Sequence, residues 1–219
     1  MIQRRQAKIY EGGLPGLIER ARSLARSGPR SLLGICGAPG SGKSTLAESL
    51  VAALGAQAAL VPMDGFHLSN SELIRLGRRD RKGAIDTFDA SGYVALLRRL
   101  QAADEPVVYA PEFRREIEEA IAGAIAVPRD VPLIVTEGNY LLSNAEPWCA
   151  IGPMLDEAWY VDPGEGLRLE RLIARHIAFG KGADFARSWS LGPDQRNAEL
   201  IAATRAAADL VIMAQDLRA

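Results

Sequence analysis

The sequence has few lysines, few cysteines, no surplus of either charge and no long apolar run. Its 219 residues carry 26 Lys and Arg side chains against 27 Asp and Glu, which gives a formal net charge of -1. A nucleic-acid module with a broad phosphate-binding surface normally has a basic surplus, and a disordered chain has fewer apolar residues than the 48% found here. The composition therefore speaks against both classes. Only four of the basic residues are lysines, namely Lys8, Lys43, Lys82 and Lys181, so the place of each lysine is informative.

The cysteines and the apolar runs predict the compartment. Cys36 and Cys149 lie far apart, which favours buried thiols over a disulfide framework. The N-terminal stretch MIQRRQAKIYEGG lacks the apolar core of about 7 to 15 residues that a signal peptide has, and no segment approaches the roughly 18 apolar residues of a membrane span. We expect a cytoplasmic protein that does not enter a membrane.

Short apolar runs alternate with amphipathic helical patterns, and no repeat or long linker interrupts them. The expected strands are Ser31–Cys36, Ala58–Met63, Val107–Ala110, Leu133–Thr136, Ala158–Val161 and Leu210–Met213. The expected helices are Leu17–Gly28, Lys43–Leu54, Ser69–Leu76 and Tyr93–Leu100. Residues 115–127 fit a helix by composition and a strand by alternation, so both readings stay open. The pattern predicts one α/β domain over residues 1–219, with a helical segment over 1–30 and a mostly parallel sheet flanked by helices on both faces.

A phosphate-binding motif lies between the first expected strand and the helix that follows. It reads Gly37-Ala38-Pro39-Gly40-Ser41-Gly42-Lys43-Ser44-Thr45 and matches G-x-x-x-x-G-K-[ST]. Glycines let backbone N–H groups converge on phosphate oxygens, and the helix N-terminus faces the same anion. We expect Lys43 to bridge the β- and γ-phosphates of a nucleotide, Ser44 to bind Mg²⁺ and Thr45 to lie beside the α-phosphate.

A carboxylate follows the second expected strand, at Asp64. Ligands bind beyond the carboxyl ends of the strands in open α/β sheets, so Asp64 is expected to face the same crevice as the phosphate-binding motif. It is a candidate general base for a substrate hydroxyl. The alternative is that Asp64 only caps a helix or forms a turn with Gly65.

Six segments resemble the P-loop kinase superfamily that contains bacterial pantothenate kinase, uridine kinase and phosphoribulokinase. In chain order they are GAPGSGKST, PMDGFHLSN, RKGAIDTFDA, YAPEF, TEGNYLL and RLIARHIAFGK. The chain most resembles proteins described as nucleoside/nucleotide kinase-like or as candidate fructose transport system kinases. The resemblance spans residues 31–213 and implies the three-layer P-loop fold with a helical lid over about residues 168–192.

The resemblance also implies roles for individual residues. Asp64 corresponds to the catalytic base and Lys43 to the phosphate-bridging lysine. Glu137 corresponds to an acidic residue that supports Mg²⁺, although a helix-start carboxylate is the simpler reading. Arg171 and Arg175 correspond to lid arginines that close over the transferring phosphate, with His176 beside them; the alternative is solvated charge on a helix face. The segment Gly180-Lys181-Gly182 would be the tip of that lid.

The acceptor side is less determined by the sequence. His67 lies three residues after Asp64 and either contacts the substrate or is a packed or surface imidazole. Motif position adds further candidate substrate ligands: Asp86, Tyr109, Phe113 and Asn139. Relatives often have an acidic residue after the aromatic of the P-x-F segment, whereas this chain has Arg114 and Arg115. This pair favours an acceptor that carries a carboxylate or phosphate, with Arg114 as the candidate substrate ligand. The alternative is that the motif is displaced and both arginines face solvent.

These observations predict a kinase that uses ATP and Mg²⁺ to phosphorylate a hydroxyl of a small metabolite. A sugar such as fructose, a nucleoside and a pantothenate-like acid all fit. The alternative is a nucleotide-dependent regulatory ATPase or switch with a protein partner, and a binding protein without catalysis is a third hypothesis. The basic run at residues 78–83 is interpreted as a mobile substrate-side loop rather than a nucleic-acid site. Relatives often form dimers, so a homodimer is compatible with the resemblance.

Overall fold

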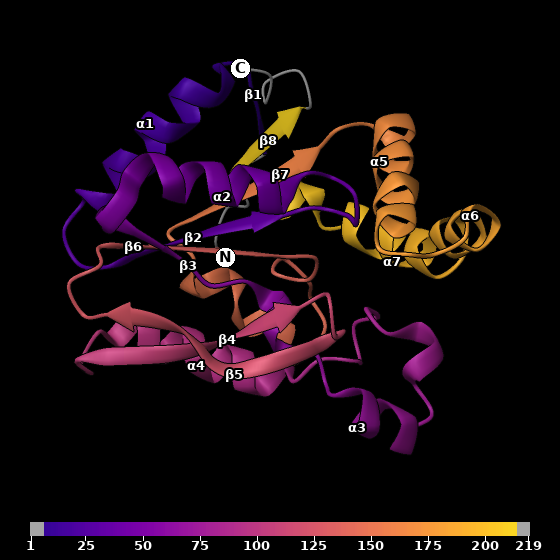
Figure 1. Ribbon diagram of the computed structural model, residues 1–219. Helices are drawn as coiled ribbons and strands as arrows, with labels where there is room; N and C mark the ends of the chain where they lie inside the picture. The colour runs from indigo at the N-terminus through magenta and orange to yellow at the C-terminus, as the bar shows by residue number, and fades with distance from the viewer. Residues whose placement is uncertain (1–6, 214–219) are drawn as a thin grey trace.

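The computed structural model describes residues 7–213, and the ends of the expected domain, residues 1–6 and 214–219, lie outside them. A central sheet of parallel strands runs through this part of the chain (Figure 1). In spatial order the strands are β1 (Lys8–Tyr10), β8 (Leu210–Met213), β7 (Glu157–Asp162), β2 (Ser31–Cys36), β6 (Leu133–Gly138) and β3 (Ala58–Leu60). The parallel sheet expected from the apolar runs is confirmed, and β1 is a strand that the sequence pattern did not predict.

Both faces of the sheet are covered. Successive residues of each central strand point to opposite faces, so side chains on both sides of the strand are buried. Leu33 and Val135 pack on one side with the helices α1 (Gly13–Ala25) and α2 (Lys43–Leu54). Leu32 and Ile134 pack on the other with α4 (Ala90–Ala102), which is capped at its start by the Asp89 carboxylate. Figure 1 shows α1 and α2 above the sheet and α4 below it. The chain therefore forms three layers.

A separate antiparallel hairpin corrects the expectation for residues 107–127. Its strands are β4 (Val107–Arg114) and β5 (Glu119–Pro128), and they form their own two-stranded sheet. The run at 107–110 is therefore a strand, but it does not belong to the central sheet. Only alternate residues of the run are fully buried: Val108 and Ala110 face the core, whereas Tyr109 is 59% exposed. The undetermined segment 115–127 is the turn and the second strand of this hairpin.

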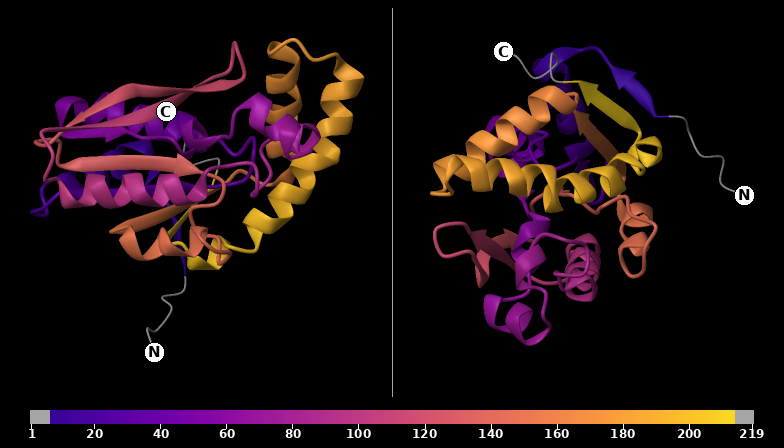
Figure 2. Two further views of the ribbon diagram at one scale, coloured as in Figure 1. Left: turned by 90° about the horizontal axis from the view of Figure 1, so that it is seen from below. Right: turned by 90° about the vertical axis from the view of Figure 1, so that its right-hand side faces the viewer.

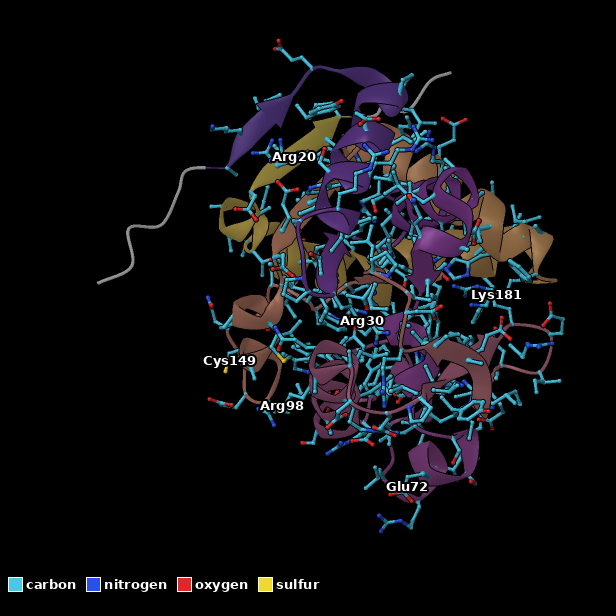
Figure 3. The ribbon with its side chains drawn as sticks, turned by 90° about the vertical axis from the view of Figure 1, so that its left-hand side faces the viewer. Arg20, Arg30, Glu72, Arg98, Cys149 and Lys181 are labelled. Atoms are coloured by element: carbon cyan, nitrogen blue, oxygen red, sulfur yellow. The ribbon has the colours of Figure 1, made fainter. Side chains whose placement is uncertain are left out.

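The remaining helices lie at the carboxyl end of the strands. They are α3 (Asn70–Arg75), α5 (Glu165–Ala178), α6 (Ala183–Leu191) and α7 (Pro193–Ala202). Figure 2 shows α5, α6 and α7 together at one end of the molecule, with the turn of the hairpin and α3 beside them. Among residues 7–213 no helix is long and apolar enough to cross a bilayer.

Candidate functional site

The phosphate-binding motif forms the loop between β2 and α2, where the sequence predicted it. Gly40 and Gly42 have φ angles of +84° and +94°, which side chains rarely adopt. A Cβ on Gly40 would come within 2.5 Å of the Arg168 carbonyl oxygen, because the backbone of α5 lies directly against the loop. Glycine is thus needed here both for the backbone angle and for the close approach. The loop leads into the N-terminus of α2, the arrangement that binds phosphate through backbone N–H groups.

Ser44 and Glu137 meet at the start of α2. Glu137 is in β6 beside β2, and its Oε1 accepts a hydrogen bond of 3.1 Å from the Ser44 hydroxyl. Its second oxygen, Oε2, is buried and has no hydrogen-bond partner among the described residues. Burial raises the pKa of Glu137 above its ordinary value, although the charge of Lys43 opposes that change. A buried carboxylate with a free oxygen beside a serine hydroxyl is a donor set that suits a hard cation.

The test for a magnesium site is whether these groups match the needs of the ion. Mg²⁺ prefers oxygen ligands and usually binds one or two carboxylates together with water and substrate phosphates. Ser44 and Glu137 supply two such oxygens next to the phosphate-binding loop. Residues 7–213 contain no group of three or more His, Cys, Asp or Glu that could hold a metal by itself. The residues therefore fit an ion that is shared with a nucleotide, rather than one enclosed by protein ligands.

Asp64 lies in a short 3-10 turn, Met63–Phe66, that follows β3. The expected strand ends at Leu60 instead of Met63, since Pro62 has no N–H to donate. The Asp64 carboxylate is 27% exposed, and its Oδ2 lies 3.3 Å from Nη2 of Arg115. Burial favours the neutral acid, but it is outweighed by the charge of His67, which is protonated at the acidic pH where Asp64 titrates, and by the charges of Arg115 and Lys43, so the pKa of Asp64 lies below its ordinary value. Asp64 is therefore an ionised carboxylate at neutral pH.

His67 packs beside Asp64 between two aromatic rings. Its ring centroid is 4.0 Å from that of Phe88 and 4.7 Å from that of Phe113. Burial lowers the pKa of His67, so the imidazole is neutral at pH 7. Nδ1 lies 2.8 Å from the Asp64 carbonyl oxygen and, in the neutral ring, donates to it. This bond leaves Nε2 as an acceptor.

A cavity of about 170 Å³ brings these groups together. Pro39, Lys43 and Ser44 line it from the phosphate-binding loop, and Asp64, His67, Phe113 and Asn139 line it from the neighbouring segments. The Oδ1 atom of Asn139 is buried and has no partner among the described residues. Helix α5 and the residues that follow it contribute Arg175, His176 and Lys181. Burial lowers the pKa of Arg175.

Three of the candidate substrate ligands and one of the two candidate lid arginines do not line this cavity. Asp86 is paired with Arg81, and Tyr109 is on the exposed side of β4. Arg114 is paired with Glu112 at 2.6 Å and is 56% exposed, because neighbouring residues at the end of β4 point in opposite directions. Arg171 borders a second cavity instead, together with Gly42, Thr45 and Leu14. The pair Arg171 and Arg175 is thus divided between two cavities.

Several residues of the site were not predicted from the sequence. Arg115 was considered together with Arg114, and only Arg114 was named as a substrate ligand, yet Arg115 is the arginine that reaches Asp64. Lys82 and Trp189 also line the cavity, from the basic run and from α6. Arg168, which is 4% exposed, donates from Nη1 to the Pro39 carbonyl oxygen at 3.2 Å and so ties α5 to the phosphate-binding loop. The scarcity of lysine was the one available signal, and it pointed to Lys82.

Known kinases resemble this chain in sequence and in fold. No protein-family model matches the chain. A candidate uridine kinase of Schizosaccharomyces pombe is 34% identical over 173 residues, which cover 75% of this chain and 74% of that protein. The crystal structure of a candidate fructose transport system kinase from Silicibacter sp. TM1040 is 38% identical in sequence and has a TM-score of 0.83. The match covers 92% of this chain and 99% of that one. The P-loop protein YFH7 of Saccharomyces cerevisiae has the same fold at 18% identity, with a TM-score of 0.75 and coverage of 91% and 98% of the two chains.

Proposed function

The chain belongs to the P-loop kinase superfamily that includes uridine kinase and pantothenate kinase, and on that basis we propose that it transfers the γ-phosphoryl group of ATP to a hydroxyl of a small metabolite. Asp64 is the proposed base, and Lys43 and Arg175 are the proposed phosphate ligands. The observation that carries the proposal is the common cavity: an ionised carboxylate faces the same space as the phosphate-binding lysine. A hydroxyl bound there would lie between the two.

In the proposed reaction, Asp64 orients the acceptor hydroxyl and takes its proton. A bond forms between the acceptor oxygen and the γ-phosphorus, the bond from that phosphorus to the β–γ bridging oxygen breaks, and ADP leaves with the electron pair. Lys43 and Arg175 neutralise charge on the transferring group. Because the chemistry is mostly positioning and charge stabilisation, a weak base is sufficient as long as it is ionised and aligned.

Mg²⁺ is the proposed metal, and Ser44 and Glu137 are its proposed ligands, directly or through water. When bound it would neutralise part of the charge of the nucleotide phosphates. The free oxygen of Glu137 supports this assignment, since an orphaned buried carboxylate oxygen is costly unless a ligand pairs with it.

The sequence is compatible with three classes of acceptor: a sugar such as fructose, a nucleoside or a pantothenate-like acid. The relatives are themselves named for different acceptors, among them uridine, pantothenate and D-glycerate. We also propose that residues 168–192 close over the bound nucleotide as a lid of one kinase domain, and that the chain is a homodimer, which light scattering would test.

The experiment is a coupled assay of ADP release with a panel of alcohols. A kinase releases ADP faster when its acceptor is present, whereas a regulatory ATPase with a protein partner releases ADP equally with and without alcohols. Asp64→Asn is expected to reduce acceptor-dependent turnover by roughly 10²- to 10⁴-fold, the usual contribution of a general base. Affinity for a non-hydrolysable ATP analogue should change little. Unchanged turnover in this variant would show that Asp64 is not the base.

A further inference from the structure

The cavity holds positive side chains that the proposed phosphoryl transfer does not use. Lys82 and Arg115 line it together with Asp64 and Phe113. They come from the basic run and from the turn of the hairpin, not from the loop or the lid. Besides Asp64, the carboxylates in the same lining are Asp194, which is bound to His176 at 2.8 Å, and Glu118, which is exposed. The lining has more basic side chains than carboxylates, so the cavity has an excess of positive charge. The basic side chains are Lys43, Arg79, Lys82, Arg115, Arg175 and Lys181.

Lys82 has a half-buried ammonium group that forms no ion pair among the described residues, although the carboxylates of Glu118 and Glu119 are near enough to act on its charge. Nζ donates to Asn70 Oδ1 at 2.9 Å and to the Glu118 carbonyl oxygen, and both acceptors are neutral. Within residues 7–213 no carboxylate forms an ion pair with it, and burial lowers the pKa of Lys82. An ammonium has three N–H donors, so one remains for a ligand. Nζ also lies 5.0 Å from the centroid of the Phe113 ring, which lines the cavity.

The surroundings of Lys82 are fixed by a network and not by chance surface contact. The backbone N–H of Asn70 donates to Glu119 at 2.9 Å, and the Asn70 side-chain amide donates to the Glu118 carbonyl at 3.1 Å. These bonds join the start of α3 to the turn of the hairpin, and Lys82 spans the junction. Such a network holds the ammonium in one place, as a binding site for a specific group requires.

Arg115 is the second positive group, and its present partner is the proposed base. The Nη2 to Oδ2 distance of 3.3 Å is long for a charge-assisted hydrogen bond. The guanidinium also lies 5.9 Å from the Phe113 centroid and 6.0 Å from the Phe179 centroid. An anionic group bound beside Phe113 would compete with Asp64 for Arg115. Asp64 would then be released to accept a hydrogen bond from the acceptor hydroxyl.

We infer that the acceptor carries an oxyanion, either a carboxylate or a phosphate, in addition to the hydroxyl that is phosphorylated, and that Lys82 and Arg115 bind this oxyanion. The inference rests on the proposed function and narrows its substrate class. A lysine ammonium and an arginine fork are the two side chains best suited to oxyanions. The bound anion would offset the unpaired charge of Lys82 and the weak pairing of Arg115 at the same time. Neutral sugars and nucleosides would leave both uncompensated.

The test compares acceptors that differ only in the anion. One series is glucitol, gluconate and 6-phosphogluconate; a second is fructose and fructose 6-phosphate; a third is panthenol and pantothenate. ADP release is measured for each with wild type, Lys82→Gln, Lys82→Arg and the control Arg114→Gln, whose side chain lies outside the cavity. We expect kcat/KM to be at least tenfold higher for an anionic member than for its neutral partner. The two kinds of anion in the panel show whether carboxylate or phosphate is preferred.

The variants link that preference to Lys82. Lys82→Gln should raise KM for the anionic acceptor about tenfold or more, Lys82→Arg should restore part of the loss, and Arg114→Gln should leave KM as in wild type. KM for ATP should change by less than twofold in each variant. Neutral acceptors preferred over their anionic partners, or an unaltered acceptor KM in Lys82→Gln, would overturn the inference and leave the kinase assignment standing. Absence of stimulation by every alcohol, with ATP analogue still bound, would overturn the proposed function itself.

Discussion

Arg168 gives a prediction that depends on tertiary structure alone. Its guanidinium is 4% exposed and joins three elements: it donates to the Pro39 carbonyl at 3.2 Å, to Glu165 at 2.7 and 2.9 Å, and to Gln195. Arg171 is on the same helix, three residues later, and is exposed. We predict that Arg168→Met lowers the free energy of unfolding substantially, while Arg171→Met does not.

The magnitude follows from what each partner loses. The Pro39 carbonyl loses a charge-assisted bond worth about 1.5 to 3 kcal/mol, and the Gln195 amide loses a further bond of about 1 kcal/mol. The Glu165 side chain is 62% exposed and is rehydrated when its partner is removed, so that pair contributes about 0 to 1 kcal/mol. The sum is about 2.5 to 5 kcal/mol, and methionine preserves most of the apolar stem. For Arg171→Met the expected change is below about 0.5 kcal/mol.

Thermal unfolding followed by circular dichroism measures the difference. For a domain of this size, about 1 kcal/mol corresponds to roughly 2 to 4 °C in Tm, so Arg168→Met should unfold roughly 5 to 20 °C below wild type. Urea unfolding of the same variants gives the free energies directly and checks that the transition remains cooperative. If Arg168→Met and Arg171→Met unfold at the same temperature, the tie between α5 and the phosphate-binding loop does not stabilise the fold.

Three further predictions test the packing, the histidine and the metal. Gly138→Ala should cost about 1 to 3 kcal/mol, because its Cβ would lie 2.5 Å from the Met63 Cβ, whereas Gly152→Ala, with open space around it, should cost little in the same thermal assay. The pKa of His67 lies below its ordinary value, so the unfolded chain binds the proton more readily than the folded chain. The free energy of unfolding should therefore fall as the pH drops below about 6.5. In urea titrations across pH, His67→Gln should weaken this dependence of the free energy of unfolding on pH. ATP should raise the Tm of the wild type, and chelation of Mg²⁺ should reduce that increase. In Glu137→Gln, chelation of Mg²⁺ should change the increase less, because one ligand of the ion is weakened. An equal effect of Mg²⁺ on both proteins would contradict the assignment of Glu137 as a ligand.

The local parts of the fold could be predicted from the sequence. The phosphate-binding helix begins at Lys43 and ends at Leu54 as its pattern indicated, since both ends are marked by glycines. The strands of the central sheet are short apolar runs because both of their faces are covered. These are properties of a few neighbouring residues, so periodicity is enough to find them. Strand β1 has two exposed residues out of three and therefore gives no such pattern.

Periodicity could not predict that the hairpin forms its own sheet. It also could not predict which arginine of each pair lines the cavity. Val107–Ala110 has the composition of a buried strand, and only its tertiary partners decide which sheet it joins. Arg114 and Arg115 are adjacent, so the direction of each side chain depends on where the strand ends and the turn begins. Arg171 and Arg175 share a helix, yet they border different cavities, and the phosphate-binding loop packs against the same helix at Arg168 and Leu172. A helical face tells which residues are neighbours, but not what covers that face.

The distribution of lysine has a physical explanation in this site. Three of the chain's four lysines, Lys43, Lys82 and Lys181, line the same cavity, although arginine is the usual basic residue elsewhere. Many of the arginines form ion pairs with carboxylates of the chain, as Arg99 does with Glu105. Within the described residues these three lysines form no ion pair with a carboxylate, so their charge is available to a ligand. A compact ammonium is a point charge that a phosphate or an acceptor anion can approach from several directions, whereas a planar guanidinium binds its partner in a fixed geometry. A near-neutral composition is therefore compatible with a strongly positive site, since many arginines are paired with carboxylates of the fold and these three lysines are not.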